Sequence, residues 1–400
     1  MELTPGLRRD PRPDLGAVGE ATELVERIRS EIRADGPMPF SRFMELALYD
    51  PEDGYYRSAD ARPGRTGDFL TAPEAHPIFG RAVARTLADA WDRLGRPDPF
   101  VVREHGAGTG ALAEAILRGL DTDRPELLRS VRYQAIEIDP RRIDAFCDRL
   151  GDAGFESAIE SADERVIEGA IVANEVLDAL PVHRLAGRDG GVLERYVGLD
   201  GDRFVDVWGE PSRPELVERL RREGVRLADG QSAEVALGID AWVAGATRGL
   251  RRGLVLVIDY GAVARELYDP ALRRHGTLRA YLRHRVHDDP YLHVGRQDLT
   301  AHVDVTALQQ AAVTAGLTVV GTTSQAEFLV GTGIEDVLRE VQADPATSLE
   351  SYLPLRSALM RLLDPAAMGR FRVLAFGRDW PPGGPPRGFG YRLSRQARRD

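Results

Sequence analysis

A glycine-rich turn between an apolar strand and a helix constrains the fold of this chain more than any other feature. The strand-like run Phe100–Glu104 is followed by His105-Gly106-Ala107-Gly108-Thr109-Gly110, and then by helical periodicity over 112–120. Glycines carry no side chain, so a ligand can approach the backbone amides at the start of the helix. This order of elements predicts the first corner of a parallel α/β sheet with a cofactor at its edge.

Strand and helix patterns alternate after this turn. Short apolar runs that end in polar residues are typical of parallel strands buried on both faces. They occur at 133–137, 170–174 and 254–259, with a weaker one at 156–160 and a last one at 371–376. We therefore expect an α/β, Rossmann-like fold: a seven-stranded, mostly parallel sheet with helices on both faces and a reversed final strand near Phe371.

Composition shifts divide the 400 residues into a core and its elaborations. Two stretches hold more structure than crossover connections need, and we expect them to form an inserted substrate-binding subdomain. The predicted segments are a flexible N-terminus (1–18), N-terminal helices with a lid loop (19–98), the core (99–181 and 251–378), the two insertions (182–250 and 262–304) and a disordered tail (381–400).

Charge and cysteine content exclude several classes of protein. The net charge of -10 argues against a general nucleic-acid binder, which needs Lys and Arg to neutralise phosphates. Cys147 is the single cysteine, so no intrachain disulfide can form, and no apolar run is long enough for a signal segment or a membrane span. We expect a cytoplasmic protein without membrane contact. No His and Cys cluster has the spacing of a zinc site, so no metal is predicted.

Acidic residues near the glycine turn indicate which cofactor binds there. Gly106, Gly108 and Ala111 also satisfy the looser dinucleotide pattern, which keeps an NAD-dependent oxidoreductase as an alternative. Glu104 precedes the first glycine by two residues; a carboxylate there can hold a cationic group but opposes a pyrophosphate. Glu137 and Asp139, placed to accept ribose hydroxyls, lie 27 and 29 residues beyond Gly110, and the usual dinucleotide spacing is roughly 20. These acids favour S-adenosyl-L-methionine, with Gly106, Gly108 and Gly110 forming its cradle.

A further polar segment, Asn174 to Pro181, follows the run at 170–174. Ligands of open α/β sheets bind outside the carboxyl ends of the strands, so Asn174, Glu175 and Asp178 are expected to face the same crevice as the glycine turn. Glu175 and Asp178 are three residues apart and can converge on one substrate group if the segment is helical.

Six segments together resemble the MidA-like methyltransferases, a family that includes a mitochondrial complex I assembly factor that methylates protein arginine. They span roughly residues 36–330. The segments are Gly67 to Glu74, Glu104 to Gly110, Ala173 to Pro181, Ile258 to Gly261, Gly276 to Arg279 and Gly295 to Asp304.

The resemblance implies a Rossmann-like class I methyltransferase and a role for each matched residue. It implies that the loop with Gly67 and Asp68 closes over the cofactor, and that Glu104 to Gly110 cradles it. It also implies that Asn174, Glu175 and Asp178 form the methyl-transfer site. The residues it places on the substrate side are Asp259, Tyr260, His302 and Asp304. Departures occur at Ala75-His76 and at Glu137-Ile138-Asp139-Pro140, and they bear on the identity of the substrate.

The residues leave the methyl acceptor open. If it is a protein arginine, Glu175 and Asp178 would orient the guanidinium and take its proton, because its pKa is above about 12. If it is a small molecule with a hydroxyl or amine, the base would be a histidine of the insertion: His284, His287, His293 or His302. A third alternative is a cofactor-binding assembly factor without turnover. The oligomeric state is also open, with a homodimer as one option.

Overall fold

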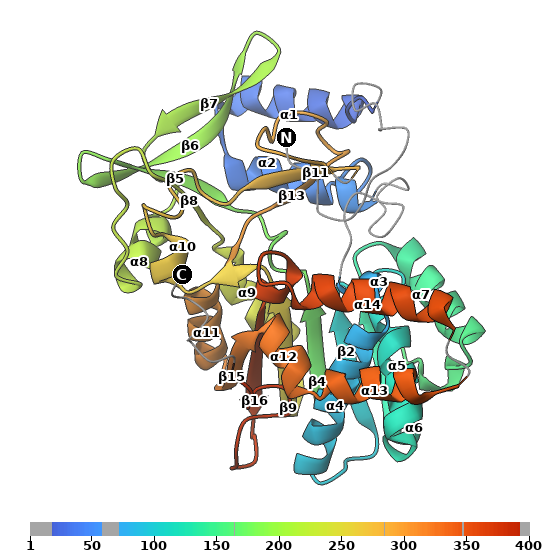
Figure 1. Ribbon diagram of the computed structural model, residues 1–400. Coiled ribbons are helices and arrows are strands. Elements are labelled where there is room, and N and C mark those ends of the chain that lie inside the picture. Colours follow the sequence, from blue (N-terminus) through green and yellow to red (C-terminus); the bar gives the residue numbers. More distant parts are fainter. Residues whose placement is uncertain (1–17, 58–71, 164, 284, 346–347, 393–400) are drawn as a thin grey trace. The chain divides into compact units, whose positions relative to one another are not determined.

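The computed structural model describes residues 18–57, 72–163, 165–283, 285–345 and 348–392 (Figure 1). The chain divides into two compact units, each built from three separate segments. Unit 1 comprises Met1–Leu70, Leu177–Val243 and Gly261–Ala311, and unit 2 comprises Thr71–Val176, Ala244–Tyr260 and Ala312–Asp400. The two units are described in turn.

Unit 2 is built on a six-stranded sheet with the order β15-β16-β9-β4-β2-β3. Four neighbouring strands are parallel: β9, β4, β2 and the edge strand β3. The strand β16 runs antiparallel to both of its neighbours, β9 and β15. The strands are β2 (Phe100–His105), β3 (Val131–Ile136), β4 (Ile167–Asn174), β9 (Leu250–Asp259), β15 (Thr318–Ser324) and β16 (Arg372–Arg378). The parallel core and the reversed final strand confirm the predicted α/β architecture.

The predicted number of seven strands is wrong for the part of the chain that the structure describes. Residues Glu156–Ala158, where we expected a weak strand, form a 3-10 helix instead. Only an isolated parallel bridge between Tyr133 and Ile159 extends the sheet beyond β3. The segment between α7 (Pro140–Asp152) and β4 is therefore too irregular to add a strand to this edge.

Helices flank this sheet, and two of them meet through glycines. α4 (Ile78–Arg93) packs on α5 (Ala111–Asp123), where a Cβ on Gly80 would lie 2.3 Å from Cβ of Ala115. The other helices of unit 2 are α3 (Ala72–Ala75), α6 (Pro125–Ser130), α7 (Pro140–Asp152), α12 (Gln325–Gly331), α13 (Ile334–Ala343) and α14 (Leu349–Leu363). No helix among the described residues is long and apolar enough to span a membrane.

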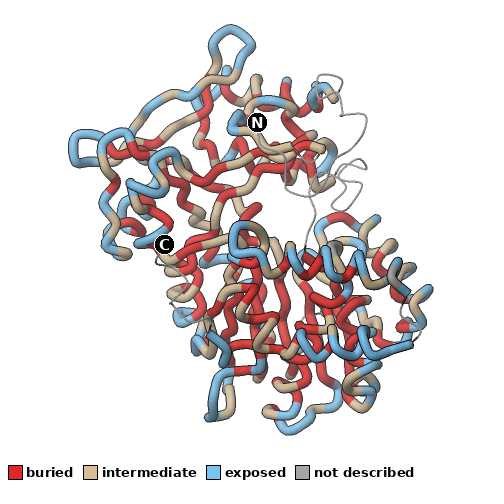
Figure 2. Tube along the Cα trace, viewed as in Figure 1, coloured by how far each residue is buried: buried red, intermediate tan, exposed pale blue. Residues whose placement is uncertain are grey.

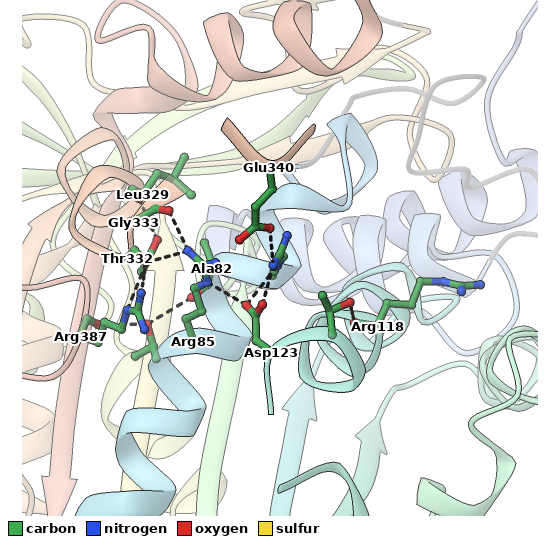
Figure 3. A network of polar contacts seen from close by, with 12 residues as sticks. Ala82, Arg85, Arg118, Asp123, Leu329, Thr332, Gly333, Glu340 and Arg387 are labelled. Atoms are coloured by element: carbon green, nitrogen blue, oxygen red, sulfur yellow. Dashed lines mark hydrogen bonds and ion pairs between the residues drawn. The ribbon is translucent and has the colours of Figure 1, made fainter. Parts of the chain in front are cut away.

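The C-terminal segment is part of unit 2, which corrects the predicted disordered tail. Residues 381–392 are described, and Phe389 is buried against Phe328 of α12. Two arginines donate to the Thr332 carbonyl: Arg387 of the C-terminal segment and Arg85 of α4. Arg85 also donates to Asp123, so that these residues form one polar network (Figure 3). Residues 393–400 lie outside the described part of the chain.

Unit 1 combines the N-terminal helices with both predicted insertions. α1 (Thr22–Asp35) and α2 (Phe40–Tyr49) bury Leu24 and Phe43 in one core with Val197 and Leu299, which come from the two insertions. Figure 2 shows the distribution of buried and exposed stretches along the chain. A single core of this kind means that the N-terminal helices and the insertions fold as one body. The predicted boundary at residue 98 is therefore replaced by the boundary at Thr71.

Three small sheets and several short helices complete unit 1. A five-stranded sheet has the path β1-β6-β5-β8 with β7 paired to β6, so that residues 191–209 form an antiparallel hairpin. Its strands are β1 (Met38–Pro39), β5 (His183–Arg188), β6 (Gly191–Asp200), β7 (Arg203–Gly209) and β8 (Ser232–Val235). The others are β10 (Gly261–Ala262), β11 (Arg279–Leu282), β12 (Arg285–His287), β13 (Asp298–Thr300) and β14 (Val303–Asp304). The helices are α8 (Pro214–Arg222), α9 (Gly238–Ala246), α10 (Ala264–Leu267) and α11 (Val305–Thr314), with α9 and α11 continuing into unit 2.

Candidate functional site

The glycine turn lies at the carboxyl end of β2 and adopts a backbone that side chains disfavour. Gly106, Gly108 and Gly110 have φ angles of 67°, 54° and 82°, which are left-handed. A Cβ on Gly106 would lie 2.7 Å from Cγ2 of Val176. The Gly106 N–H donates to the Ile136 carbonyl at the end of β3 (2.9 Å), so the turn is tied to the neighbouring strand. The chain therefore needs glycine here both for conformation and for space.

Glu104, the acid predicted to face the cofactor, is buried at the end of β2. It is 3% exposed, and its Oε2 accepts a hydrogen bond from the Tyr133 hydroxyl at 2.7 Å. Burial raises the pKa of Glu104 to about 8; the Tyr133 hydrogen bond acts in the opposite direction and the nearby Glu137 carboxyl adds to the rise. A cationic group bound beside Glu104 would therefore favour the ionised form of this carboxyl.

The two predicted ribose acceptors differ in their surroundings. Glu137 Oε2 accepts from the Gly108 N–H (3.0 Å), which places this carboxylate against the glycine turn. Asp139 instead caps α7: its Oδ1 accepts from the Arg141 N–H (3.0 Å), and its Oδ2 pairs with the Arg141 guanidinium (2.8 Å). The Arg141 guanidinium holds the pKa of Asp139 below its usual value. The other oxygen of Glu137, Oε1, accepts from the Ile138 N–H (2.8 Å), so Glu137 lies at the glycine turn whereas Asp139 lies at the start of α7.

Glu175 follows β4 in a strained backbone conformation. Its φ of 52° is left-handed, and its N–H donates to the Ile258 carbonyl of β9 (2.8 Å). Its Oε1 accepts from the Ala72 N–H (3.2 Å) and from Asn174 Nδ2 (3.1 Å). Among the described residues, the buried Oδ1 of Asn174 has no hydrogen-bond partner, and the two hydrogen bonds to the Glu175 carboxyl both go to its Oε1. This pair of residues therefore presents two oxygen acceptors to a ligand.

The surroundings of Glu175 favour its protonated form. Removal of the carboxyl from water raises its pKa to about 8, and the carboxylates of Asp259 and Glu74 add to the rise, whereas the two hydrogen bonds lower it. A carboxyl with a pKa close to neutrality can both accept and return a proton during catalysis.

Asp259 and Tyr260, predicted on the substrate side, stand at the end of β9. Asp259 is 2% exposed, and its two oxygens accept from the N–H groups of Val176 (3.2 Å) and Tyr260 (2.8 Å). Asp259 thereby fixes the turn that carries Glu175. The ring of Tyr260 lies 3.7 Å from that of Phe371, centroid to centroid.

The remaining predicted site residues belong to unit 1 or are not described. The buried Asp178 accepts at its carbonyl from the Ala301 N–H (2.9 Å), which joins its segment to the one that carries His302. His302 and Asp304 line a small cavity of about 10 Å³, also lined by Arg219 and Tyr268. Gly67, Asp68 and His284 lie outside the described residues. Within the described ranges, no group of three His, Cys, Asp or Glu side chains could hold a metal ion.

The sequence reasoning missed two contributors to the unit 2 site. Tyr133 binds Glu104, and the backbone of Ala72, at the start of α3, binds Glu175. Strand periodicity placed Tyr133 in β3, but its contact depends on how β3 pairs with β2. No local signal marks the Ala72 amide, which is provided by the backbone alone.

The family of the chain follows from similarity over most of its length. The sequence model of the family described as "Putative S-adenosyl-L-methionine-dependent methyltransferase" matches residues 82–323. The chain belongs to this family. The methyltransferase is 36% identical to a Burkholderia thailandensis protein whose crystal structure holds S-adenosyl-homocysteine; the match covers 97% of this chain and 99% of that one, with a TM-score of 0.86.

Two curated relatives are also similar along nearly the whole methyltransferase. One is the protein arginine methyltransferase NDUFAF7 homolog, mitochondrial, of Drosophila melanogaster, 29% identical over 91% of each chain. The other is protein arginine methyltransferase NDUFAF7, mitochondrial, of Homo sapiens, 25% identical over 90% of this chain and 84% of the relative. The predicted enzyme class and its cofactor are thus confirmed, and the alternative of an NAD-dependent oxidoreductase is wrong. The cytoplasmic location and the homodimer stay predictions.

The unit 2 site fits S-adenosylmethionine by its chemistry and its space. The turn has three left-handed glycines, and no atom lies within 4 Å of a Cβ added to Gly108, which leaves the backbone open to a bulky ligand at that position. Two acids flank this turn, Glu104 and Glu137, which suits a ligand with a cationic amino-acid end and ribose hydroxyls.

Proposed function

We propose that this methyltransferase modifies a guanidinium nitrogen of arginine in a protein, and that Glu175 orients the acceptor and takes its proton. The observation that carries the proposal is the Glu175 carboxyl, whose Oε1 is held by the Ala72 N–H and by Asn174. This leaves Oε2 to receive an N–H of the acceptor. The relatives named protein arginine methyltransferases support the choice of acceptor.

The residues of unit 2 would divide the work between holding the cofactor and handling the proton. Gly106, Gly108 and Gly110 would hold S-adenosylmethionine along the turn, with Glu104 toward its ammonium and Glu137 toward its ribose. When bound, the cofactor supplies an activated methyl group on its sulfonium. Catalysis by the protein then consists mostly of alignment, which can contribute roughly 7 to 11 kcal/mol.

Glu175 would take the proton that the guanidinium nitrogen loses on methylation. A guanidinium, with a pKa above about 12, does not lose this proton to water at neutral pH, so an ionised carboxylate must be in contact with it. Asn174 keeps Glu175 in position, and Asp259 keeps the turn in position through two backbone amides.

Other predicted roles remain part of the proposal. Asp178 would share the acceptor with Glu175, and Tyr260, His302 and Asp304 would line the substrate side. Asp139, which caps α7, would act on the ribose only indirectly, through the orientation of that helix. Gly67 and Asp68 would close over the cofactor.

Replacement of the two proposed catalytic acids tests their role. We expect Glu175→Gln and Asp178→Asn to bind S-adenosyl-homocysteine as the wild type does but to lose roughly 100-fold or more in kcat. Unchanged turnover in both variants would exclude the assignment.

The pH dependence of kcat tests the same role in the wild type. Because Glu175 must be ionised and its pKa is about 8, the wild-type kcat should rise about tenfold per pH unit below that value and level off above it.

Labelling identifies the acceptor. With tritiated S-adenosylmethionine and cell extract, we expect label in protein, and methylated arginine after acid hydrolysis of that protein. Label in organic-extractable metabolites instead would identify a small-molecule methyltransferase. Cofactor binding without label in either fraction would identify an assembly factor without turnover.

A further inference from the structure

The buried Tyr133 hydroxyl makes a hydrogen bond to the Glu104 carboxyl. Tyr133 lies on β3, is fully buried, and donates to Glu104 Oε2 at 2.7 Å. Among the described residues no other hydrogen bond reaches this carboxyl. The hydroxyl is therefore the protein group that fixes where the Glu104 carboxyl points.

The groups around Glu104 are neutral or acidic. Its strand partners are Ala135 on β3 and Val172 on β4, neither of which carries a charge. The titratable groups that face it are Tyr133 and the Glu137 carboxyl just beyond β3. The ring of Tyr133 also lies near the ring of Phe146 from α7, with a centroid distance of 6.0 Å. No described cation balances a negative charge on Glu104.

We propose that Tyr133 is a positioning residue of the cofactor site: its hydroxyl holds the Glu104 carboxyl, which releases a proton to solvent when a ligand bearing an ammonium group binds at the glycine turn. The O–H bond of the carboxyl breaks, the proton passes to buffer, and the ligand ammonium provides the compensating positive charge. The inference rests on the proposed role of Glu104 in holding the amino-acid end of the cofactor.

The sign of the effect follows from the charges. Burial keeps the pKa of Glu104 near 8 in the free protein, so the carboxyl is mostly protonated at neutral pH. An ammonium group within contact distance favours the ionised form and lowers this pKa. Binding therefore releases close to one proton per ligand below about pH 7, and fewer as the pH approaches 9.

Calorimetry on the full chain measures this release without any methyl acceptor. S-adenosyl-homocysteine is titrated at several values between about pH 6.5 and 8.5, in two buffers of different ionisation enthalpy, which gives the number of protons released. We expect about one proton at the lowest pH and a Kd that falls nearly tenfold per pH unit there.

Two variants test whether Glu104 releases the proton and whether the Tyr133 hydroxyl affects this release. Glu104→Gln should abolish the release and flatten the pH dependence of Kd. Tyr133→Phe removes one oxygen and should weaken binding about tenfold while moving the midpoint of release to higher pH, because the hydroxyl stabilises the ionised carboxyl. Tyr196→Phe is the matched control: it removes a hydroxyl that donates to the Glu210 carbonyl (2.8 Å) in unit 1, and both quantities should stay at wild-type values.

The outcomes separate the inference from the function on which it rests. Tight binding of S-adenosyl-homocysteine without proton release overturns the inference alone, as does a Tyr133→Phe variant with unchanged Kd and midpoint. The pKa of Glu175 is also about 8, so release that disappears in Glu175→Gln but persists in Glu104→Gln would assign the proton to Glu175 and overturn the role of Glu104. No binding by the folded wild type would overturn the cofactor site itself.

Discussion

Gly106 combines the two reasons for which a site needs glycine at a given position. Its φ of 67° disfavours any residue with a Cβ, and that Cβ would meet Val176 Cγ2 at 2.7 Å. Val176 belongs to the turn that Asp259 holds and that also carries Glu175. A change at Gly106 therefore disturbs the proposed cofactor cradle and the proposed catalytic acid together.

Substitution of Gly106 by alanine separates these two effects when it is compared with a second glycine. We expect Gly106→Ala to lose S-adenosyl-homocysteine binding by tenfold or more and to lower the free energy of unfolding by roughly 2 kcal/mol, from strain and overpacking. Gly201, in the turn between β6 and β7, has a similar φ of 60° but no atom within 4 Å of its added Cβ. Gly201→Ala should lose only about 1 kcal/mol and bind normally. Equal binding by both variants, measured by calorimetry, would contradict the steric argument.

At the scale of elements, the C-terminal segment 381–392 stabilises unit 2 by joining α4 to α12. The Arg387 carbonyl accepts from Thr86 of α4 (3.0 Å), and the Arg387 guanidinium donates to the Thr332 carbonyl after α12 (2.8 Å). Arg85 reaches the same turn through the Gly333 carbonyl (2.7 Å) and also pairs with Asp123 at the end of α5 (Figure 3). These contacts hold three helices together at positions far apart in the sequence.

Phe389 provides the apolar part of this attachment. It is 1% exposed, and its ring packs edge-on against Phe328 with a centroid distance of 5.6 Å. Phe389→Ala should lower the free energy of unfolding by about 3 kcal/mol, because it leaves a cavity between α12 and β15. Tyr391→Ala, which changes a side chain that is 39% exposed two residues later, should cost less than about 1 kcal/mol. Equal melting temperatures for the two variants would mean that the segment does not pack as described.

At the scale of the whole molecule, three buried carboxyls set the pH dependence of stability. Burial raises the pKa of Glu104, Glu175 and Glu223 from 4.5 to about 8. Glu223 follows α8, has a side chain with 0% exposure, and lies beside Asp304, whose carboxylate is the second cause of its raised pKa. Each of these acids binds a proton more tightly in the folded chain than in the unfolded one. Their contribution to stability is fully present below pH 4.5 and is lost as the pH rises toward 8.

We therefore expect the melting temperature to fall between about pH 6.5 and pH 8.5, by roughly a few degrees for each acid. The range starts at pH 6.5 because burial lowers the pKa of His105 from 6.5 to about 4, which has the opposite effect on stability below that pH. Glu223→Gln replaces the protonated acid by a neutral isostere and should reduce this slope through its effect on unit 1. Scanning calorimetry at several pH values checks both statements. Glu218→Gln, at a position exposed on α8 and paired with Arg221, is the control and should leave the slope unchanged. A melting temperature that rises with pH over this range would contradict the raised pKa values.

Most elements of unit 2 and the glycine turn can be predicted from the sequence alone. Periodicity and turn residues depend on neighbours within a few positions, so β2, the glycine turn, α5, β4 and the reversed β16 were predicted at nearly their observed bounds. A second local signal is present at Asp139: an aspartate directly before a proline such as Pro140 is typical of a helix N-cap, and Asp139 caps α7. The proline and glycine content of the C-terminal segment predicts disorder, but Phe389 is buried and holds the segment to unit 2.

Contacts between residues far apart in the sequence follow from the packing of the folded chain. The register of β2 against β3 brings Tyr133 to Glu104, and the packing of unit 2 brings the Ala72 amide to Glu175. The assembly of the N-terminal helices with both insertions into one unit depends on a shared core, to which residues as far apart as Leu24 and Leu299 contribute. Such contacts depend on how many side chains from distant segments fit together and become buried, and a local sequence pattern does not predict this.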